Sequence, residues 1–468
     1  MASFAAFTHW TGAHRFGMVH GEGALMKAKT RGLWEAMSRM LQHTGYQDQV
    51  KQHLQDFSRQ RKIGFVSLMA IILNMVRRTT QVELDEFREK FMPEEAAVTS
   101  YTKQSFSEAR QKLRPEAFTL LNDAFIQKFY ADDDYKTFKG FRLLAIDGSV
   151  IEIPNTPELR TAYGVATGTQ GFAVARARAS HIIDVENHLV IHATLGRYDS
   201  AERDLAQINI ETLLRLVPHA ALNLLLFDRG YPSLAFLHDL TVQHLKYVMR
   251  VSTAFYHEVL GTATPDETVT ILVTAKRARK LKRQGTPVPK GTGVTLRVLK
   301  VELPTGETEI LITNLTPDEL SYAEAKPLYF KRWGVETHYG DVKHKFEVEN
   351  FSGKTPLVIA QDYHATILLA NMASVIEQDA QEEWEARRDQ VQRKYAEYKI
   401  NTNILVGKMK HRLMAIILED DPQKQETAYG RLIADLTRNI LPIIPGRSSP
   451  RKKAPKANKY SPSKRRCL

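Results

Sequence analysis

The chain has 468 residues and a formal net charge of +12, with a sequence pI of about 9.4. That length predicts more than one domain. The hydrophobic fraction of 43% and charged fraction of 25% are typical of a soluble globular protein, which excludes a disordered or membrane-embedded chain. The basic balance favours a polyanionic partner, either a nucleic acid or an anionic membrane surface.

Cysteine usage and apolar runs narrow the classes further. The single cysteine, Cys467, excludes an intrachain disulfide and any cysteine-based zinc site. The longest apolar stretch, FVSLMAIILNMV from Phe65, is too short to span a bilayer and predicts a buried helix. The first residues lack the features of a signal peptide. We therefore expect a cytoplasmic protein that does not contact a membrane.

Residues 25–135 read mostly as helices, with apolar residues spaced three and four apart. In SYTKQSFSEARQKLRPEAF, Thr102 or Ser100 is the expected N-cap and Pro115 marks a break between two helices. Lys103 and Arg110 make this segment basic. It is either a helix that reads DNA or an ordinary basic surface.

From Phe141 the pattern changes to strands. FRLLAIDGSVIEI predicts a strand and its return, with a turn at Asp147–Gly148. ASHIIDVENHLVIHATLGR predicts a second hairpin around Glu186–Asn187, followed by a helix from Ala201. NLLLFD and HLKYVMRVS predict two further strands, the first ending at Asp228. This alternation predicts an α/β domain with a mixed sheet.

Residues 251–320 predict β segments without long helices, with a basic loop from Lys276 to Gly293 and a PTG turn from Pro304. The chain then reads as helical until about Leu441. The end, GRSSPRKKAPKANKYSPSKRRCL from Gly446, has no acidic residue and predicts a disordered basic tail.

The stretch YFKRWGVETHYGDVK predicts one continuous helix with two faces. At about 100° per residue, four polar residues fall within an arc of roughly 60°: Tyr329, Arg332, Glu336 and Lys343. An apolar stripe beside them would pack on the core: Val335, Tyr339, Val342 and Phe346. The polar row is either an exposed Arg332–Glu336 pair on a solvated face or a carboxylate flanked by cations along a phosphate backbone.

Two other carboxylates bear on that choice. Asp147 and Asp228 each follow an apolar run and precede a glycine-containing turn. Each alone could be a structural turn residue, but strand ends are also where ligands collect in α/β sheets. With Glu336 they offer three hard oxygen donors, which suit Mg²⁺ or Mn²⁺. Two such ions can support phosphoryl transfer.

These motifs resemble a known family. The spacing of Tyr329, Arg332, Glu336 and Lys343 is that of the Y-(2)-R-(3)-E-(6)-K signature of bacterial insertion-sequence transposases. The group is the insertion-sequence-four family, within the DDE transposase class. IDGS around Asp147 and FDRGY around Asp228 look like the blocks that carry its two aspartates. The resemblance is strong over residues 140–355.

The resemblance implies a ribonuclease H-like catalytic core with an inserted all-β subdomain. Flanking it we expect an α-helical N-terminal domain and a helical C-terminal region. The expected ranges are 1–135 for the N-terminal DNA-binding region, 136–250 and 321–380 for the core, 251–320 for the insertion, 381–445 for the C-terminal helices and 446–468 for the tail.

The resemblance also implies a chemistry. Asp147, Asp228 and Glu336 would hold two Mg²⁺ ions, for which Mn²⁺ can substitute. Cleavage at the transposon end and strand transfer would follow. The expected DNA contacts are Tyr329, Arg332 and Lys343 by resemblance, with Arg229, Lys276, Arg277, Arg279, Lys280, Lys103 and Arg110 as basic candidates.

The expected partner is double-stranded DNA, as terminal inverted repeats and target, with a homodimer holding both ends in the bacterial nucleoid. Two alternatives remain at this point: a DNA-binding protein without catalysis, and a nuclease that only hydrolyses. Family members that form hairpin ends are expected to use a tryptophan in the insertion, and residues 251–321 contain none. Phe255 or Tyr256 either replaces it in stacking on a flipped base or packs in the core.

Overall fold

The computed structural model describes residues 26–59, 62–74, 77–92, 100–167, 173–217, 219, 222–303, 306–388 and 394–444. The chain divides into two compact units. The first contains Met1–Asp132, Ile151–Ala177 and Gly340–Leu468, and the second contains Asp133–Val150 and Arg178–Tyr339. The predicted basic tail, 446–468, and Pro304 of the predicted PTG turn lie outside the described residues.

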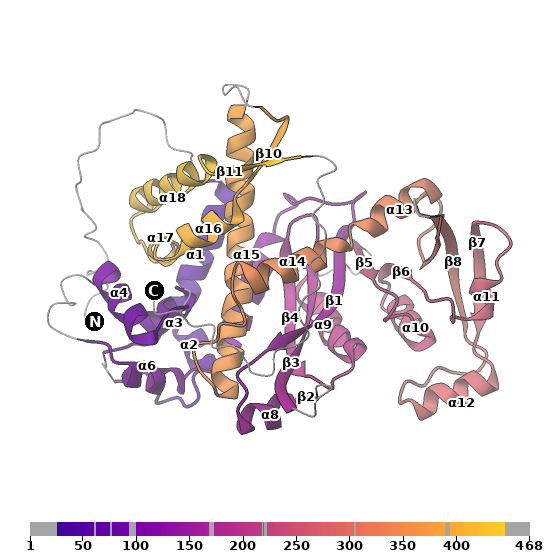
Figure 1. The fold of residues 1–468 in the computed structure, drawn as a ribbon, viewed down its shortest axis with the longest axis horizontal. Coiled ribbons are helices and arrows are strands. Elements are labelled where there is room, and N and C mark those ends of the chain that lie inside the picture. Colours follow the sequence, from indigo (N-terminus) through magenta and orange to yellow (C-terminus); the bar gives the residue numbers. More distant parts are fainter. Residues whose placement is uncertain are drawn as a thin grey trace. The chain divides into compact units, whose positions relative to one another are not determined.

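The first unit is mainly helical, and α7 and α18 pack against its longest helix, α15 (Figure 1). Its N-terminal helices are α1 (Ala28–Gln42), α2 (Thr44–Val50), α3 (Phe65–Leu73), α4 (Thr80–Phe91), α6 (Lys103–Arg110) and α7 (Glu116–Phe129). The others are α8 (Pro157–Tyr163), α15 (Pro356–Arg387), α16 (Thr402–Met409), α17 (Leu413–Ile417) and α18 (Pro422–Thr437). The N-terminal and C-terminal helices therefore share one core, because the apolar faces of α1 and α7 are covered by α17 and α15.

Several local predictions for this unit are confirmed. Thr102 caps α6 through a capping box, and Pro115 stands at the start of α7. Helix α3 is almost wholly buried, as its apolar run predicts. In the described ranges, no helix combines the length and apolar character that a bilayer crossing needs. An antiparallel pair not predicted from the sequence, β10 (Glu397–Ile400) with β11 (Ile440–Ile443), interrupts the helical C-terminal region.

The second unit is organised around a mixed sheet, which agrees with the predicted α/β class. Its strands are β1 (Arg142–Glu152), β3 (Ala173–Asp184), β4 (Leu189–Arg197), β5 (Asn223–Phe227), β6 (Lys246–Arg250), β7 (Asp266–Leu272), β8 (Gly293–Glu302) and β9 (Thr308–Thr313). The order is β3–β1–β5–β6–β9–β8–β7, with β4 paired to β3 and the short β2 (Val165–Thr167) paired to the start of β3. Strands β1, β5 and β6 run parallel, and β9, β8 and β7 follow in antiparallel order.

The parallel strands have near-continuous apolar runs, as expected for strands buried on both faces. Leu143–Ile146 and Leu224–Phe227 are fully buried. The predicted turn at Asp147–Gly148 is wrong, because β1 continues without interruption through both residues. The second predicted hairpin, around Glu186–Asn187, is present between β3 and β4, where His188 has a φ of 55°.

Helices α9 (Glu202–Leu216), α10 (Leu234–Val242), α11 (His257–Leu260), α12 (Ala275–Arg283), α13 (Tyr322–Phe330) and α14 (Trp333–His344) complete the unit, and α14 continues past its end. The first part of the segment predicted as a basic loop, as far as Arg283, is the helix α12. Thr274 caps it by accepting from the Arg277 N–H group, and Leu281 is its buried residue. Lys, Arg, Ala and Leu favour a helix, and the glycine and proline residues begin only beyond it, at Gly285.

The predicted continuous helix is broken in two at Lys331–Arg332. The N–H groups of both residues donate to carbonyl groups three residues back, a tighter turn than the α-helix. Pro327 and Gly334, on either side, are poor helix formers, so a straight helix is not favoured. Tyr329 and Glu336 therefore lie on different helices.

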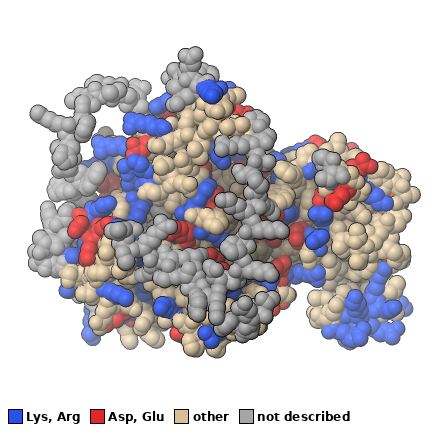
Figure 2. Space-filling model, in the orientation of Figure 1, with Lys and Arg blue, Asp and Glu red and all other residues tan. Residues whose placement is uncertain are grey.

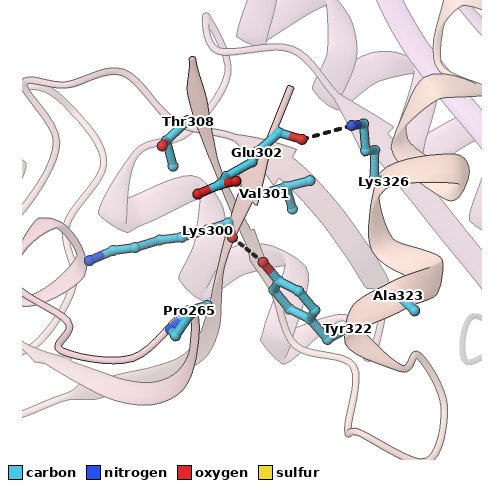
Figure 3. Close-up of a pocket in the computed structure, with 8 residues that line it drawn as sticks. All are labelled: Pro265, Lys300, Val301, Glu302, Thr308, Tyr322, Ala323 and Lys326. Carbon is cyan, nitrogen blue, oxygen red and sulfur yellow. Dashed lines mark hydrogen bonds between the residues drawn. The ribbon is translucent and has the colours of Figure 1, made fainter. Parts of the chain in front are cut away.

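Two side chains of helix α13 bond to the C-terminal end of β8 (Figure 3). The Tyr322 hydroxyl group donates to the Lys300 carbonyl oxygen, and Lys326 Nζ donates to that of Glu302 at 2.7 Å. The two side chains line a hollow of about 460 Å³. These bonds satisfy carbonyl groups at the end of β8 and fix the helix that leads into α14.

Candidate active site

Asp147 and Asp228 lie at matching positions on neighbouring parallel strands. Strands β1 and β5 pair from Arg142 with Asn223 to Ala145 with Leu226. Each aspartate lies two residues beyond the last of these pairs. Both carboxylates therefore lie just beyond the paired part of these parallel strands, on the side where α/β sheets bind ligands, although β1 itself runs on to Glu152.

Asp147 lies in a partly buried, negatively charged environment, and its side chain is 21% exposed. Burial raises its pKa to about 6, and the nearby charges of Asp228 and Glu336 add to that increase. The Gly148 N–H group, which donates to Oδ1 at 2.8 Å, and the Arg332 guanidinium act in the opposite direction. The charges of Asp228 and Glu336 therefore both act on Asp147.

Asp228 shapes the turn that follows β5. Its Oδ1 accepts from the Gly230 N–H group at 2.7 Å. A Cβ atom at position 230 would lie 3.0 Å from that oxygen, so glycine permits the close approach. Arg229 is exposed between them, and Ser233 caps α10 just beyond.

Glu336 lies in the first turn of α14 and pairs with Arg332. Arg332 Nη2 is 2.9 Å from Glu336 Oε1, and Nη1 is 3.6 Å from Asp147 Oδ2. Arg332 is only 8% exposed, so the predicted pair exists but is not a solvated surface pair. A guanidinium thus bridges two carboxylates that would otherwise repel.

Two tyrosines attach α13 and α14 to the strands that carry the aspartates. The Tyr329 hydroxyl group donates to the Phe227 carbonyl oxygen at 3.2 Å, and that of Tyr339 donates to the Asp147 carbonyl oxygen at 3.0 Å. Burial raises the pKa of Tyr329 to about 12. The structure thus gives Tyr329 a buried bond to β5 rather than a free phosphate-facing hydroxyl group.

The sequence predicts Tyr339 only as a member of the apolar stripe, together with Val335, Val342 and Phe346. All four are buried as predicted. Its anchoring role was missed, although a signal exists: a tyrosine among buried apolar residues needs a partner for its hydroxyl group.

The other residues predicted to contact DNA differ in their exposure and in their distance from Glu336. Lys343 lies on α14 seven residues beyond Glu336, on the same helical face and about 10 Å further along the axis. Lys103 is exposed at the start of α6. Arg110 is 2% exposed and bonds to Gln361 and Asp362, both at 2.8 Å. Because its guanidinium is committed to the core of the first unit, Arg110 is not a DNA contact in this structure.

Helix α12 forms a dense basic surface, visible as the blue cluster around α12 in Figure 2. Its exposed cations are Lys276, Arg279, Lys280, Lys282 and Arg283. Arg277 differs, because both its Nη atoms bond to Glu258, at 2.7 and 3.1 Å. Its guanidinium also covers the Tyr256 ring, 4.8 Å from the centroid. Arg277 therefore anchors the helix, and Tyr256 is already stacked.

The donor chemistry suits a divalent cation. Three carboxylates supply hard oxygen atoms, and the pKa of Asp147 is raised by burial and, to a smaller extent, by the charges of Asp228 and Glu336. Within the described ranges, no three His, Cys, Asp or Glu side chains converge closely enough to hold a metal ion as they stand. Arg332 occupies the space between Asp147 and Glu336, and Asp228 is turned to its own Gly230 N–H group. The fit to the ion therefore rests on the chemistry of the three carboxylates and not on their present arrangement.

Comparisons with known proteins agree with the motifs. The family model described as Transposase DDE domain matches residues 139–372, half of the chain, which includes all three carboxylates. The transposase InsG for insertion sequence element IS4 of Escherichia coli (strain K12) is 26% identical over 273 residues. That match covers 57% of this chain and 59% of the relative's length. A cryo-EM structure of the piggyBac transposase synaptic complex with hairpin DNA aligns over 90% of this chain and 86% of that chain, with 13% identity and a TM-score of 0.41.

Proposed function

Because the chain belongs to the transposase DDE domain family, we propose that it cleaves DNA at transposon ends and transfers the freed strand by two-metal phosphoryl transfer. The observation that carries this proposal is the shared electrostatic site of Asp147, Asp228 and Glu336. The matched register of the two aspartates supports it, because they come from strands that pair directly.

The proposed cofactor is a pair of Mg²⁺ ions, with Mn²⁺ able to substitute. When bound, the ions would neutralise charge on the reacting phosphate and activate the attacking hydroxyl group. Asp147 and Asp228 would hold them from the sheet and Glu336 from α14. Support comes from Arg332, a cation that already bridges Asp147 and Glu336.

Arg332 has a second role in this proposal. Guanidinium pairs with phosphate as well as with carboxylate. Once the carboxylates are neutralised, Arg332 can turn its N–H groups to a phosphate oxygen at the same place. Tyr329 then acts as a positioning residue, because its hydroxyl group holds the end of β5 next to Asp228.

The other basic residues would bind DNA by charge. Arg229 and Lys343 lie on the elements that carry Asp228 and Glu336 and would bind phosphates near the reacting group. Lys103 and the exposed cations of α12 (Lys276, Arg279, Lys280) would bind more distant phosphates, without reading sequence. Arg110 and Arg277 are left out of the contact set, because their guanidinium groups are committed to protein carboxylates.

The finer organisation belongs to the same proposal. Residues 136–250 and 321–380 would form a ribonuclease H-like core, interrupted by the insertion at 251–320. Support comes from the run β4–β3–β1–β5–β6, onto which the insertion adds β9, β8 and β7. The flanking helical regions would bind the terminal repeats, and a homodimer would hold two ends on nucleoid DNA.

The test is strand cleavage on DNA carrying the terminal repeats, with Mg²⁺. Glu336→Gln should reduce cleavage by roughly four orders of magnitude, as expected for a group that acts as part of a unit, while DNA binding in a mobility-shift assay is retained. Asp341→Asn is the matched control, because it removes one carboxylate from the same helix at the site of a Lys345 pair. Wild-type cleavage by Glu336→Gln would refute the proposal.

A further inference from the structure

A fourth carboxylate lies beside Gly148, the residue that follows Asp147. Glu202 is the first residue of α9, and its side chain rests against the backbone of Gly148. A Cβ atom at position 148 would meet Glu202 Cγ and Cδ at 3.3 and 3.4 Å. A glycine after Asp147 therefore leaves the space that Glu202 occupies. No role proposed above uses this carboxylate.

A buried hydroxyl group faces the same cluster. Tyr231 is 0% exposed, and its Oη atom has no hydrogen-bond partner among the described residues. Burial raises the pKa of Tyr231 well above its usual value, and the charges of Asp147, Glu202 and Asp228 add to that increase. A buried polar group without a partner is costly. Bound water molecules or ions commonly satisfy such groups in proteins.

Arg178 of β3 neutralises Glu202 in this structure. Its Nη1 donates to Glu202 Oε1 at 2.6 Å, and its Nε donates to the Tyr198 carbonyl oxygen at 3.1 Å. The Arg178–Glu202 pair thus resembles the Arg332–Glu336 pair. In each pair an arginine is the counter-ion of a glutamate: Arg332 lies between Glu336 and Asp147, and Arg178 bonds to Glu202 next to Gly148.

We propose that Glu202 is an outer carboxylate of the cation site at Asp147, accepting hydrogen bonds from water molecules on a divalent cation, with the Tyr231 hydroxyl group bonded to the same water layer. The inference rests on the proposed function, because it requires a cation at Asp147 and Asp228. Mg²⁺ keeps several of its water molecules in protein sites. Glu202 can therefore contribute without joining the direct ligands.

The test measures Mn²⁺ binding to the full-length protein without DNA, by electron paramagnetic resonance of the free ion. Loss of an outer partner typically weakens metal affinity 10–100-fold. Glu202→Gln should fall in that range of about 10–100-fold, and Asp147→Asn should weaken binding further. Glu211→Gln is the matched control, because it removes the same charge from an exposed position of α9 and should leave the affinity unchanged.

A second pair of variants separates this role from a simple ion pair. Tyr231→Phe keeps the buried ring and should weaken Mn²⁺ binding by about tenfold. Arg178→Met frees Glu202 and should not weaken binding. If Glu202 serves only Arg178, Glu202→Gln and Arg178→Met will lower Tm alike and leave the Mn²⁺ affinity at its wild-type value.

The outcomes also separate this inference from the proposed function. Wild-type Mn²⁺ affinity in Glu202→Gln, with weakened binding in Asp147→Asn, overturns the role of Glu202 alone. Wild-type affinity in both variants overturns the cation site itself, and with it the proposed function.

Discussion

Two charged regions of the second unit are built in opposite ways. At the ends of β1 and β5 the carboxylates are partly buried, and each has an assigned partner: Gly148 N–H for Asp147, Gly230 N–H for Asp228 and Arg332 for Glu336. On α12 the cations project into water, and Arg277 is the one held by a bidentate salt bridge. We therefore expect each carboxylate of this site to have its own role in catalysis, whereas the cations of α12 would attract DNA through their total charge.

The largest effects should follow changes at the strand ends. Asp147→Asn should reduce strand cleavage by about four orders of magnitude and, without metal, raise the free energy of unfolding. The reason for the gain is that burial and neighbouring carboxylates raise the pKa of Asp147 from 3.8 to about 6. A shift of about two units corresponds to up to about 3 kcal/mol. Urea unfolding at pH 7.5 in chelator measures the gain.

The sign of this effect gives a control by pH. The folded protein binds a proton at Asp147 more tightly than the unfolded chain does, so the wild type should gain stability from this group as the pH falls from about 7 to about 4. Asp147→Asn should not show this gain, whereas the exposed Asp239→Asn on α10 should behave as wild type. A lower free energy of unfolding in Asp147→Asn at pH 7.5 would contradict the electrostatic account.

An intermediate effect is expected where the basic helix is anchored. Arg277→Met removes two hydrogen bonds to Glu258 and the cation over the Tyr256 ring, which should destabilise α12 locally by about 1–2 kcal/mol. Amide hydrogen exchange should rise roughly 5–30-fold across 275–283 and stay unchanged in β5. Uniform protection in the variant would mean that the pair does not hold the helix.

The smallest effect should come from one exposed cation. Lys280→Gln should reduce the slope of log affinity for DNA against log salt by about 0.9, with stability unchanged. Lys354→Gln, exposed in the first unit, tests whether any lysine has this effect. A slope unchanged in Lys280→Gln would remove this residue from the DNA contacts.

The buried strands and the aspartates that follow their apolar runs could be predicted from the sequence, because an apolar run followed by a charged residue is a local pattern. The continuation of β1 past Asp147 could not, because Asp-Gly is also a common turn signal. The shared site of Asp147, Asp228 and Glu336 came from the family signature, since no local pattern brings distant residues together. The helix α12 was not predicted, because the glycine and proline residues that follow it indicate a loop. The residues Lys276–Arg283 themselves favour a helix.

The remaining misses depend on tertiary contacts. In the sequence, Arg110 and Arg277 cannot be told from other basic residues. Only the structure shows that their guanidinium groups bond to Asp362 and Glu258. Similarly, nothing near Glu202 in the chain indicates that it rests against Gly148. The break at Lys331–Arg332 had a visible signal in the flanking Pro327 and Gly334, and it moved Tyr329 off the helix of Glu336.

The parallel pairing of β1 with β5 also determines when, during synthesis of the chain, the two aspartates come together. Arg142 and Asn223 are neighbours in the sheet but distant in the chain, and pairing between distant segments forms slowly. A slip of one residue would turn Asp228 to the opposite face of the sheet. During synthesis the two aspartates stay apart until β5 has emerged and paired, and Glu336 follows later still. A nascent chain thus lacks the complete site until all three segments have emerged and β1 has paired with β5.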